Sequence, residues 1–166
     1  GFRLQRLQAL SPVSPIQEQQ FTGVTSDANV SSSAIIKIGA SADFGLTSKK
    51  HFLSTDTVKI NAAINPQGND AGQPANIYVV AELMGAVPVY MSLGRLGEWN
   101  LWNGVVTDLV PAHTVSALEN ELRFQIYSGK LDAGFKVALH IGYSTISSAN
   151  QKLIHYNSTP YVITIE

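Results

Sequence analysis

Apolar and polar residues alternate with a period of two along most of the chain after residue 32. Val58, Ile60 and Ile64 alternate with Lys59 and Asn61, which is the pattern of a strand with one buried face. Such alternation, or a short apolar run between turn residues, predicts eight strands, at residues 34–38, 58–64, 76–83, 87–91, 121–127, 135–141, 152–156 and 161–165. We find no long helical spacing, although residues 111–120 could hold one helical turn.

The spacing of these strands predicts the fold class. Eight short strands separated by turn residues are typical of a β-sandwich. We therefore predict an all-β fold, an immunoglobulin-like or jelly-roll β-sandwich of about eight strands, with a closed barrel as the alternative. Residues 76–83 are apolar on both faces, which indicates a central strand. Pro88 lacks an amide donor and places residues 87–91 at an edge or a bulge.

Residues 1–32 differ from the rest of the chain because they are rich in Gln, Ser and Pro. Phe2 and Leu4 alternate with polar residues, whereas Leu7 and Leu10 follow at helical spacing. Neither a short helix nor a lone strand can bury its apolar face unaided. We therefore divide the chain into an N-terminal extension, residues 1–32, which serves as a donor strand or a leader, and a β-sandwich domain, residues 33–166.

The composition indicates a single exported domain. The chain has 166 residues, enough for one ordinary domain and too few for two. Charged residues make up 14%, against about 25% in typical domains, so Ser, Thr, Asn and Gln must supply much of the polar surface. Absence of cysteine excludes disulfides and cysteine-ligated zinc. We predict a secreted, cell-surface protein, given as its processed mature form because no signal peptide is visible.

Charge and hydropathy exclude two classes of partner. Eleven Lys and Arg residues balance twelve Asp and Glu residues, so the chain lacks the excess positive charge of nucleic-acid-binding domains. No apolar run approaches the roughly 18 residues that a membrane-spanning helix needs. We therefore expect neither nucleic-acid binding nor a membrane span.

A series of turn and core motifs runs through the last two thirds of the chain. These motifs are Asp56-Thr57-Val58, Ile64-Asn65-Pro66, Ile77-Tyr78-Val79-Val80-Ala81, Trp99-Asn100-Leu101-Trp102-Asn103-Gly104, Tyr127-Ser128-Gly129, Gly142-Tyr143-Ser144, Ile154-His155-Tyr156-Asn157 and Pro160. In order and spacing, residues 55–166 resemble a β-sandwich module of secreted and surface proteins of Gram-negative bacteria. The resemblance implies a sandwich fold and an extracellular location.

An exported β domain behind an apolar N-terminal segment suggests a subunit that assembles. Strand addition gains a row of main-chain hydrogen bonds together with side-chain pockets, and head-to-tail contacts of this kind propagate as a filament. We therefore predict a structural, non-enzymatic subunit of a bacterial surface fibre or adhesin that self-associates into a homopolymer. Phe2, Leu4 and Leu7, or the segment with Phe21 and Val24, would supply the donated strand.

The alternative function is carbohydrate binding. Trp99 and Trp102, flanked by Tyr90 and Asn103, could stack on sugar rings and bond their hydroxyls, with surface glycans as partners. The competing interpretation is that one or both tryptophans cap the core, because tryptophan is usually mostly buried.

Other candidate chemistry is weaker. His140 and His155 lie in consecutive predicted strands, but two histidines make a poor metal site because zinc sites generally have more protein ligands. Oxygen ligands for calcium could come from Asp56, Asn65, Asn69 and Asp70, although such residues also favour turns. The sequence lacks a Gly-x-Ser-x-Gly elbow and a phosphate-binding glycine loop. We therefore expect no enzymatic activity and no cofactor, with calcium as the one alternative.

Overall fold

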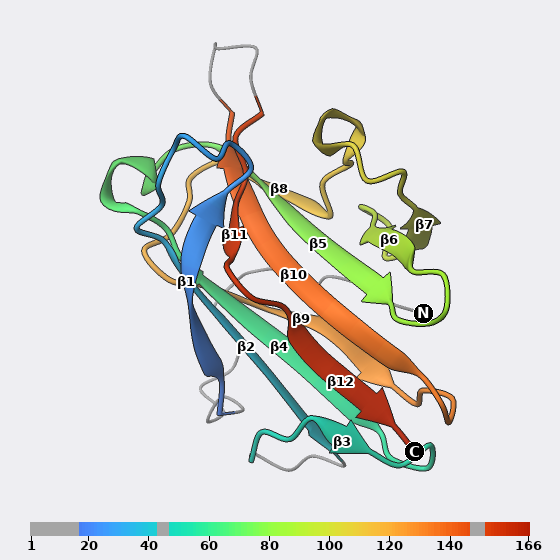
Figure 1. The fold of residues 1–166 in the computed structure, drawn as a ribbon. Helices are drawn as coiled ribbons and strands as arrows, with labels where there is room; N and C mark the ends of the chain where they lie inside the picture. Colours follow the sequence, from blue (N-terminus) through green and yellow to red (C-terminus); the bar gives the residue numbers. More distant parts are fainter. Residues whose placement is uncertain (1–16, 43–46, 147–151) are drawn as a thin grey trace.

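The computed structural model describes residues 17–42, 47–146 and 152–166, and the regular secondary structure of this part of the chain is almost all β-strand (Figure 1). The strands are β1 (Gln19–Thr25), β2 (Ile35–Ala42), β3 (His51–Phe52), β4 (Val58–Asn65), β5 (Ala75–Leu83), β6 (Val89–Leu93), β7 (Trp99–Leu101), β8 (His113–Val115), β9 (Leu122–Gly129), β10 (Lys136–Thr145), β11 (His155–Asn157) and β12 (Tyr161–Ile165). Two short 3-10 helices, η1 (Gly68–Asp70) and η2 (Val106–Asp108), complete the described elements. None of the described helices is long and apolar enough to cross a membrane.

The strands form two mainly antiparallel sheets that pack face to face. Sheet A has the order β1-β2-β4-β9, and sheet B has the order β7-β6-β5-β10. Along the other side of β10, sheet B continues with β11 and then β12, while β8 pairs with β5 and β3 pairs with β12. This architecture confirms the predicted all-β sandwich class.

Strand β1 belongs to both sheets. Residues 19–22 pair with β2 in sheet A, and residues 23–25 pair with β11 in sheet B. Phe21 is buried in the core and contacts the ring of Tyr161 edge-on, with ring centroids 6.4 Å apart. The segment with Phe21 and Val24, which we considered as a strand donated to a neighbour, thus lies in the sheets of its own chain. Because β1 falls within residues 1–32, part of the expected extension is built into the sandwich.

The core lies between the sheets and consists of the alternate, inward-facing residues of the long strands. Sheet A contributes Ile36, Ile38, Ile60, Ile64 and Phe124, among others, and sheet B contributes Ile77, Val79, Leu139, Ile141 and Ile163. Each such side chain stabilises the fold by about 1.5–3 kcal/mol through removal of apolar surface from water. The alternation of apolar and polar residues that predicted the strands therefore matches the alternation of buried and less buried side chains in the structure.

Strand β5 is also covered on its outer face, as its apolar sequence predicted. Tyr78 and Val80 point away from sheet A and pack against Leu109 and Ile154. Since β5 lies between β6 and β10, the prediction of a central strand is confirmed. A loop that includes η2 forms this second, smaller apolar cluster on the outside of sheet B.

Three local expectations differ from the structure. Residues 111–120 contain β8 and no helical turn, because residues 113–115 pair with residues 75–77 of β5. Strand β6 is not an edge strand, since β7 continues the sheet beyond it. Pro88 precedes β6, so its missing amide is not needed in the ladder. Of the strand predicted at residues 152–156, only the end forms β11.

Along β10, the neighbouring strand changes from β11 to β12. At this point the buried side chain of Asn157 forms hydrogen bonds with the backbone of β10. Its Oδ1 accepts the Ile141 amide hydrogen at 2.8 Å, and its Nδ2 donates to the carbonyls of Leu139, at 3.1 Å, and Thr159, at 2.7 Å. Asn157 is fully buried, so these backbone groups have no access to water in its place. The side-chain amide of Asn157 thus makes the hydrogen bonds to β10 that the backbone of a neighbouring strand would otherwise make.

Replacement of this amide should therefore destabilise the fold. We expect Asn157→Ala to lower the free energy of unfolding by about 2–4 kcal/mol, because it leaves two buried backbone groups of β10 without a partner. The exposed Asn120→Ala is the matched control and should change stability by less than about 0.5 kcal/mol. Urea denaturation of both variants measures the difference, and equal stabilities would contradict the role of Asn157.

Candidate functional site

Trp99 and Trp102 lie on opposite faces of sheet B. Trp99 is in β7, paired with Leu93, and packs against the main core. Trp102 lies three residues later and packs against the outer cluster with Tyr78 and Val80. Because successive residues of an extended chain point to opposite faces, the spacing of three separates the two rings. The structure therefore does not bring them together in one binding site.

Trp102 and Tyr90 form an aromatic pair on the outer face of sheet B. The Trp102 amide donates to the Tyr90 carbonyl at 2.9 Å, which extends the pairing of β6 with β7. The two rings meet edge to face with centroids 6.0 Å apart and an interplanar angle of 82°. Tyr90 is 37% exposed and Trp102 is half-buried. Tyr90 thus presents ring surface to solvent beside a ring anchored in the outer cluster.

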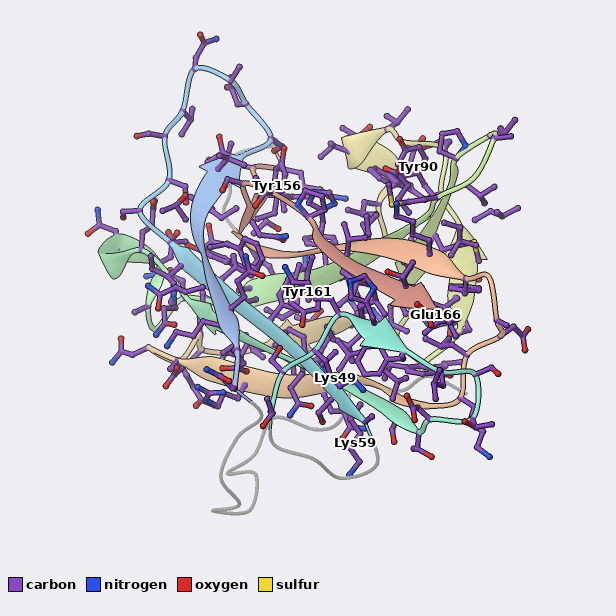
Figure 2. The ribbon with its side chains drawn as sticks, turned by 60° about the horizontal axis from the view of Figure 1, so that its bottom comes forward. Lys49, Lys59, Tyr90, Tyr156, Tyr161 and Glu166 are labelled. Carbon is purple, nitrogen blue, oxygen red and sulfur yellow. The ribbon has the colours of Figure 1, made fainter. Side chains whose placement is uncertain are left out.

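The Glu82 carboxylate and the His140 imidazole lie on the same face of sheet B as this aromatic pair. Glu82 of β5 is in register with Tyr90 and points to the same outer face. His140 of β10 lies diagonally beyond Glu82, with its ring 5.8 Å from the ring of Tyr156. Figure 2 shows Tyr90 and Tyr156 on the side of sheet B that faces away from sheet A. We name Glu82, Tyr90, Trp102, His140 and Tyr156 the outer-face row.

Side-chain hydrogen bonds stabilise the loop after Trp102. Trp102 Nε1 donates to the Val105 carbonyl at 2.9 Å, and Asn103 Oδ1 accepts the Val105 amide hydrogen at 2.8 Å. Asn103 Nδ2 donates to Asp108 Oδ2 at 2.7 Å. Asn103, which we predicted as a sugar contact, therefore also fixes the loop that supports Trp102.

Lys152 links the same loop to the outer face of sheet B through a hydrogen bond and a cation–π contact. Lys152 Nζ donates to the carbonyl of Leu109 at 2.6 Å and lies 5.3 Å from the centre of the Tyr78 ring. A cation over an aromatic face is favourable, and more so when both are partly shielded from water. The position of the Trp102 ring is thus set before any ligand binds.

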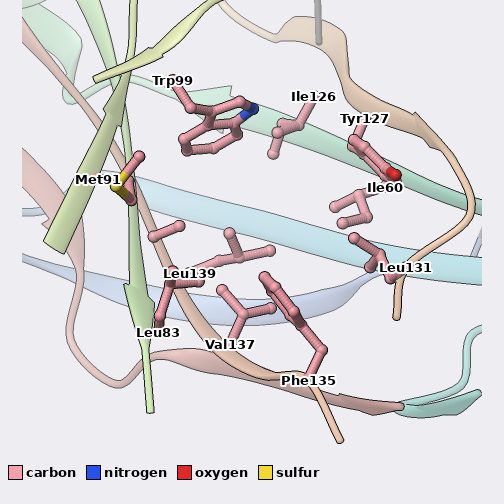
Figure 3. A pocket seen from close by; sticks show the side chains of 11 residues that line it. Ile60, Leu83, Met91, Trp99, Ile126, Tyr127, Leu131, Phe135, Val137 and Leu139 are labelled. Carbon is pink, nitrogen blue, oxygen red and sulfur yellow. The ribbon is translucent and has the colours of Figure 1, made fainter. Parts of the chain in front are cut away.

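On the inner face, Trp99 lines an apolar pocket between the two sheets (Figure 3). The pocket has a volume of about 180 Å³, is partly open, and presents only apolar and aromatic side chains. Its lining residues are Ile60, Ala81, Leu83, Met91, Trp99, Ile126, Tyr127, Leu131, Phe135, Val137 and Leu139. We name it the intersheet pocket. It offers no polar group that could orient a sugar.

A buried histidine lies in a polar cluster of residues that are far apart in the sequence. His155 Nδ1 is 2.7 Å from Ser32 Oγ, and its Nε2 is 3.6 Å from Asp70 Oδ2. The Tyr143 ring stacks on the imidazole at 4.8 Å, and its hydroxyl donates to the same Asp70 oxygen at 2.6 Å. His155 and His140 thus point to opposite faces of sheet B and are not the neighbours that we considered.

The Ser32, His155 and Asp70 cluster lacks the geometry of a hydrolytic triad. Nucleophile activation needs a base that is bonded both to the hydroxyl and to an orienting group. The gap of 3.6 Å between His155 and Asp70 exceeds a hydrogen bond, and Asp70 instead accepts from Tyr143. Ser32 Oγ also accepts the Ala34 amide hydrogen at 3.2 Å. We interpret the cluster as a clamp between the loops of residues 32 and 70 and the strands β10 and β11.

Three of the four candidate calcium ligands, Asp56, Asn65 and Asp70, form hydrogen bonds within the chain. Their recorded contacts are Asp56 Oδ2 with the Leu53 amide at 2.8 Å, Asn65 Nδ2 with the Asn120 carbonyl at 3.2 Å, and Asp70 Oδ2 with Tyr143. Asn69 lies in η1, beside a shallow polar hollow that it lines with Ser33, Gln67 and Gly68. Within the described ranges, no three His, Asp or Glu side chains are grouped closely enough to hold a metal ion.

Burial lowers the pKa of three histidines, His113, His140 and His155. Desolvation lowers the pKa of His155, opposed by the nearby Asp70 carboxylate, and lowers the pKa of His140, opposed by Glu82. Desolvation also lowers the pKa of His113, and the charge of Arg95 adds to this effect. The folded protein therefore favours the neutral imidazole at all three positions.

These shifts predict that the domain loses stability in mild acid. The unfolded chain takes up protons near the ordinary histidine pKa of about 6.5, whereas the folded chain takes them up at lower pH. The free energy of unfolding should fall as pH drops from about 7.5 to about 5.5, and His155→Gln should reduce the slope. Urea midpoints across this range measure it. A stability that rises toward acid would contradict the inferred shifts.

Comparison with known proteins places the chain in no family. No family model matches the sequence, and no curated protein matches it. Among solved structures, the chain is similar to a carbohydrate binding module of family 9 from Caldicellulosiruptor kristjanssonii in complex with glucose. That similarity has a TM-score of 0.33 and 10% sequence identity, over 91% of this chain and 84% of that chain. A score this low supports no inference about function, which must come from the residues themselves.

Proposed function

We propose that this domain binds carbohydrate on the outer face of sheet B. The observation that carries the proposal is the Tyr90 and Trp102 pair, in which an exposed ring is held against an anchored one beside the Glu82 carboxylate. Aromatic faces stack on the C–H groups of sugar rings, and a neighbouring carboxylate accepts hydrogen bonds from sugar hydroxyls. The site is shallow and preformed, which keeps the ordering cost of binding small.

The charges beside the aromatic pair indicate the class of glycan. Glu82 lies next to Tyr90 in the sheet, and Asp108 is bonded to Asn103 in the loop after Trp102. The Lys152 ammonium on this face is directed at the Leu109 carbonyl and the Tyr78 ring. The two carboxylates beside the aromatic pair would therefore repel uronic acids and sulfated sugars. We therefore propose a neutral polysaccharide as the ligand. This role agrees with the extracellular location expected from the composition.

Removal of the exposed ring should abolish most of the binding. We expect Tyr90→Ala to weaken affinity at least about tenfold, the effect of losing a contact worth about 1.4 kcal/mol at a binding hot spot. Tyr90→Phe, which keeps the ring and loses only the hydroxyl, is the matched control and should retain most of the affinity. Affinity electrophoresis through gels with β-glucan, xylan, glucomannan or soluble starch measures both variants.

The result that contradicts carbohydrate binding is equally clear. Wild-type protein that migrates identically in gels with and without each of these four neutral polysaccharides would remove the proposal. A further contradiction would be equal retardation of the wild type and Tyr90→Ala, because binding would then lie outside the outer-face row.

The fibre-subunit prediction concerns two segments, of which the first lies outside the described part of the chain. Phe2, Leu4 and Leu7 lie there, so their donation to a second copy stays a prediction, as does membership of a Gram-negative surface-protein family. Phe21 and Val24 are already paired within their own chain. The outer-face row is built entirely from described residues, and for this reason we favour carbohydrate binding.

A further inference from the structure

Two aromatic pairs lie on the outer face of sheet B. Tyr90 of β6 and Trp102, directly after β7, form the first pair. His140 of β10 and Tyr156 of β11 form the second, with ring centroids 5.8 Å apart and an interplanar angle of 76°. Figure 2 labels one member of each pair, Tyr90 and Tyr156. The carbohydrate site proposed above rests on the first pair and gives the second pair no role.

The register of the strands gives the separation of the two pairs. Tyr90 is opposite Glu82 of β5, whereas His140 is opposite Val80, two residues before Glu82. Two strand spacings amount to about 10 Å, and two residues along a strand to about 7 Å. Tyr90 and His140 are therefore about 12 Å apart along a diagonal of the sheet. A sugar ring stacked on Tyr90 lies over that ring, so only a later sugar of the same chain reaches the second pair.

Short side chains and one carboxylate lie between the two pairs. Ala138 and Val80 are 2% and 8% exposed, and neither side chain is as long as the aromatic ones on either side. Glu82 is in register with Ala138, and its negative charge opposes the lowering of the His140 pKa by burial. The Glu82 carboxylate is thus adjacent to Tyr90 and close enough to His140 to interact with it.

Packing against the sheet positions the second pair. Tyr156 packs against the outer apolar cluster and lies opposite Gly142 of β10. A Cβ at Gly142 would lie only 2.9 Å from the Tyr156 Cβ, so the glycine allows Tyr156 to lie close against β10. His140 is two residues before Gly142 and therefore lies on the same face. The Tyr156 ring, like the Trp102 ring, is held in position before a ligand binds.

We propose that the outer face of sheet B binds several consecutive sugars of one neutral glycan chain, which crosses the strands from Tyr90 to His140 and Tyr156. This proposal rests on the carbohydrate binding proposed above and adds the length and direction of the ligand. One sugar stacks on Tyr90, a later sugar contacts the second pair, and Glu82 accepts hydrogen bonds from hydroxyls between them. Because the second contact is made by a chain that is already bound, a long ligand binds more tightly than a short one.

The dependence of affinity on ligand length tests this proposal without any substitution. Titration calorimetry of the wild type compares the disaccharides cellobiose, xylobiose, mannobiose and maltose with cellohexaose, xylohexaose, mannohexaose and maltohexaose. For the type of sugar that binds, we expect the hexasaccharide to bind at least about tenfold more tightly than the disaccharide.

Removal of the second pair should abolish the gain from length alone. We expect His140→Ala to weaken hexasaccharide binding at least about fivefold and to leave disaccharide binding unchanged. His140→Phe keeps an aromatic ring and should retain most of the hexasaccharide affinity. The matched control is His113→Ala, because His113 is also half-buried but lies opposite Ile77, on the inner side of sheet B. Urea midpoints establish that each variant is folded.

Two results would overturn the extended site and leave carbohydrate binding intact. The first is an equal affinity of the wild type for the disaccharide and the hexasaccharide. The second is a hexasaccharide advantage that survives in folded His140→Ala, because the later sugars would then bind elsewhere. Absence of binding by every sugar would remove the proposed function and this inference with it.

Discussion

The pairing of β5 with β10 is the interaction on which the rest of the structure depends. The two strands are in register over nine residue pairs, from Ala75 with Thr145 to Leu83 with Val137. Because neighbouring residues point to opposite faces, this strand pair contributes side chains to both the inner and the outer surface of sheet B. The inner surface closes the core against sheet A, and the outer surface carries the smaller apolar cluster and the outer-face row. The core and the candidate ligand site are thus two sides of one sheet.

The two sheets are matched over most of their area but not at one edge. Sheet B continues through β6 and β7, whereas β9 ends sheet A within the described residues. This mismatch produces the intersheet pocket and leaves Leu101 exposed. Trp99 and Trp102 lie at this edge on opposite faces of sheet B, so the fluorescence of each ring is sensitive to a different surface. The outer ring is available to a ligand, while the inner ring belongs to the space between the sheets.

The sequence predicted the long strands after residue 32 because alternation over five or more residues is visible without knowledge of partners, whereas the seven-residue β1 was assigned to the N-terminal extension. Strands of two or three residues, such as β3 and β8, show no period and exist only because a neighbour pairs with them. The opposite faces of Trp99 and Trp102 could have been inferred from their spacing. The position of Glu82 beside Tyr90 can be inferred only when the register of β5 with β6 is known. The hydrogen bond between Ser32 and His155 joins residues that are 123 positions apart. No local pattern predicts contacts of that kind.

The most direct test of the account uses the two tryptophans separately. Trp99→Phe leaves Trp102 as the one fluorophore of its kind, and Trp102→Phe leaves Trp99. Each variant is titrated with the same four neutral polysaccharides while tryptophan emission is recorded. If the ligand binds on the outer face, we expect a saturable change in emission from Trp102 and none from Trp99. A response from Trp99 alone, or no response from either variant, would contradict a ligand site on the outer face of sheet B.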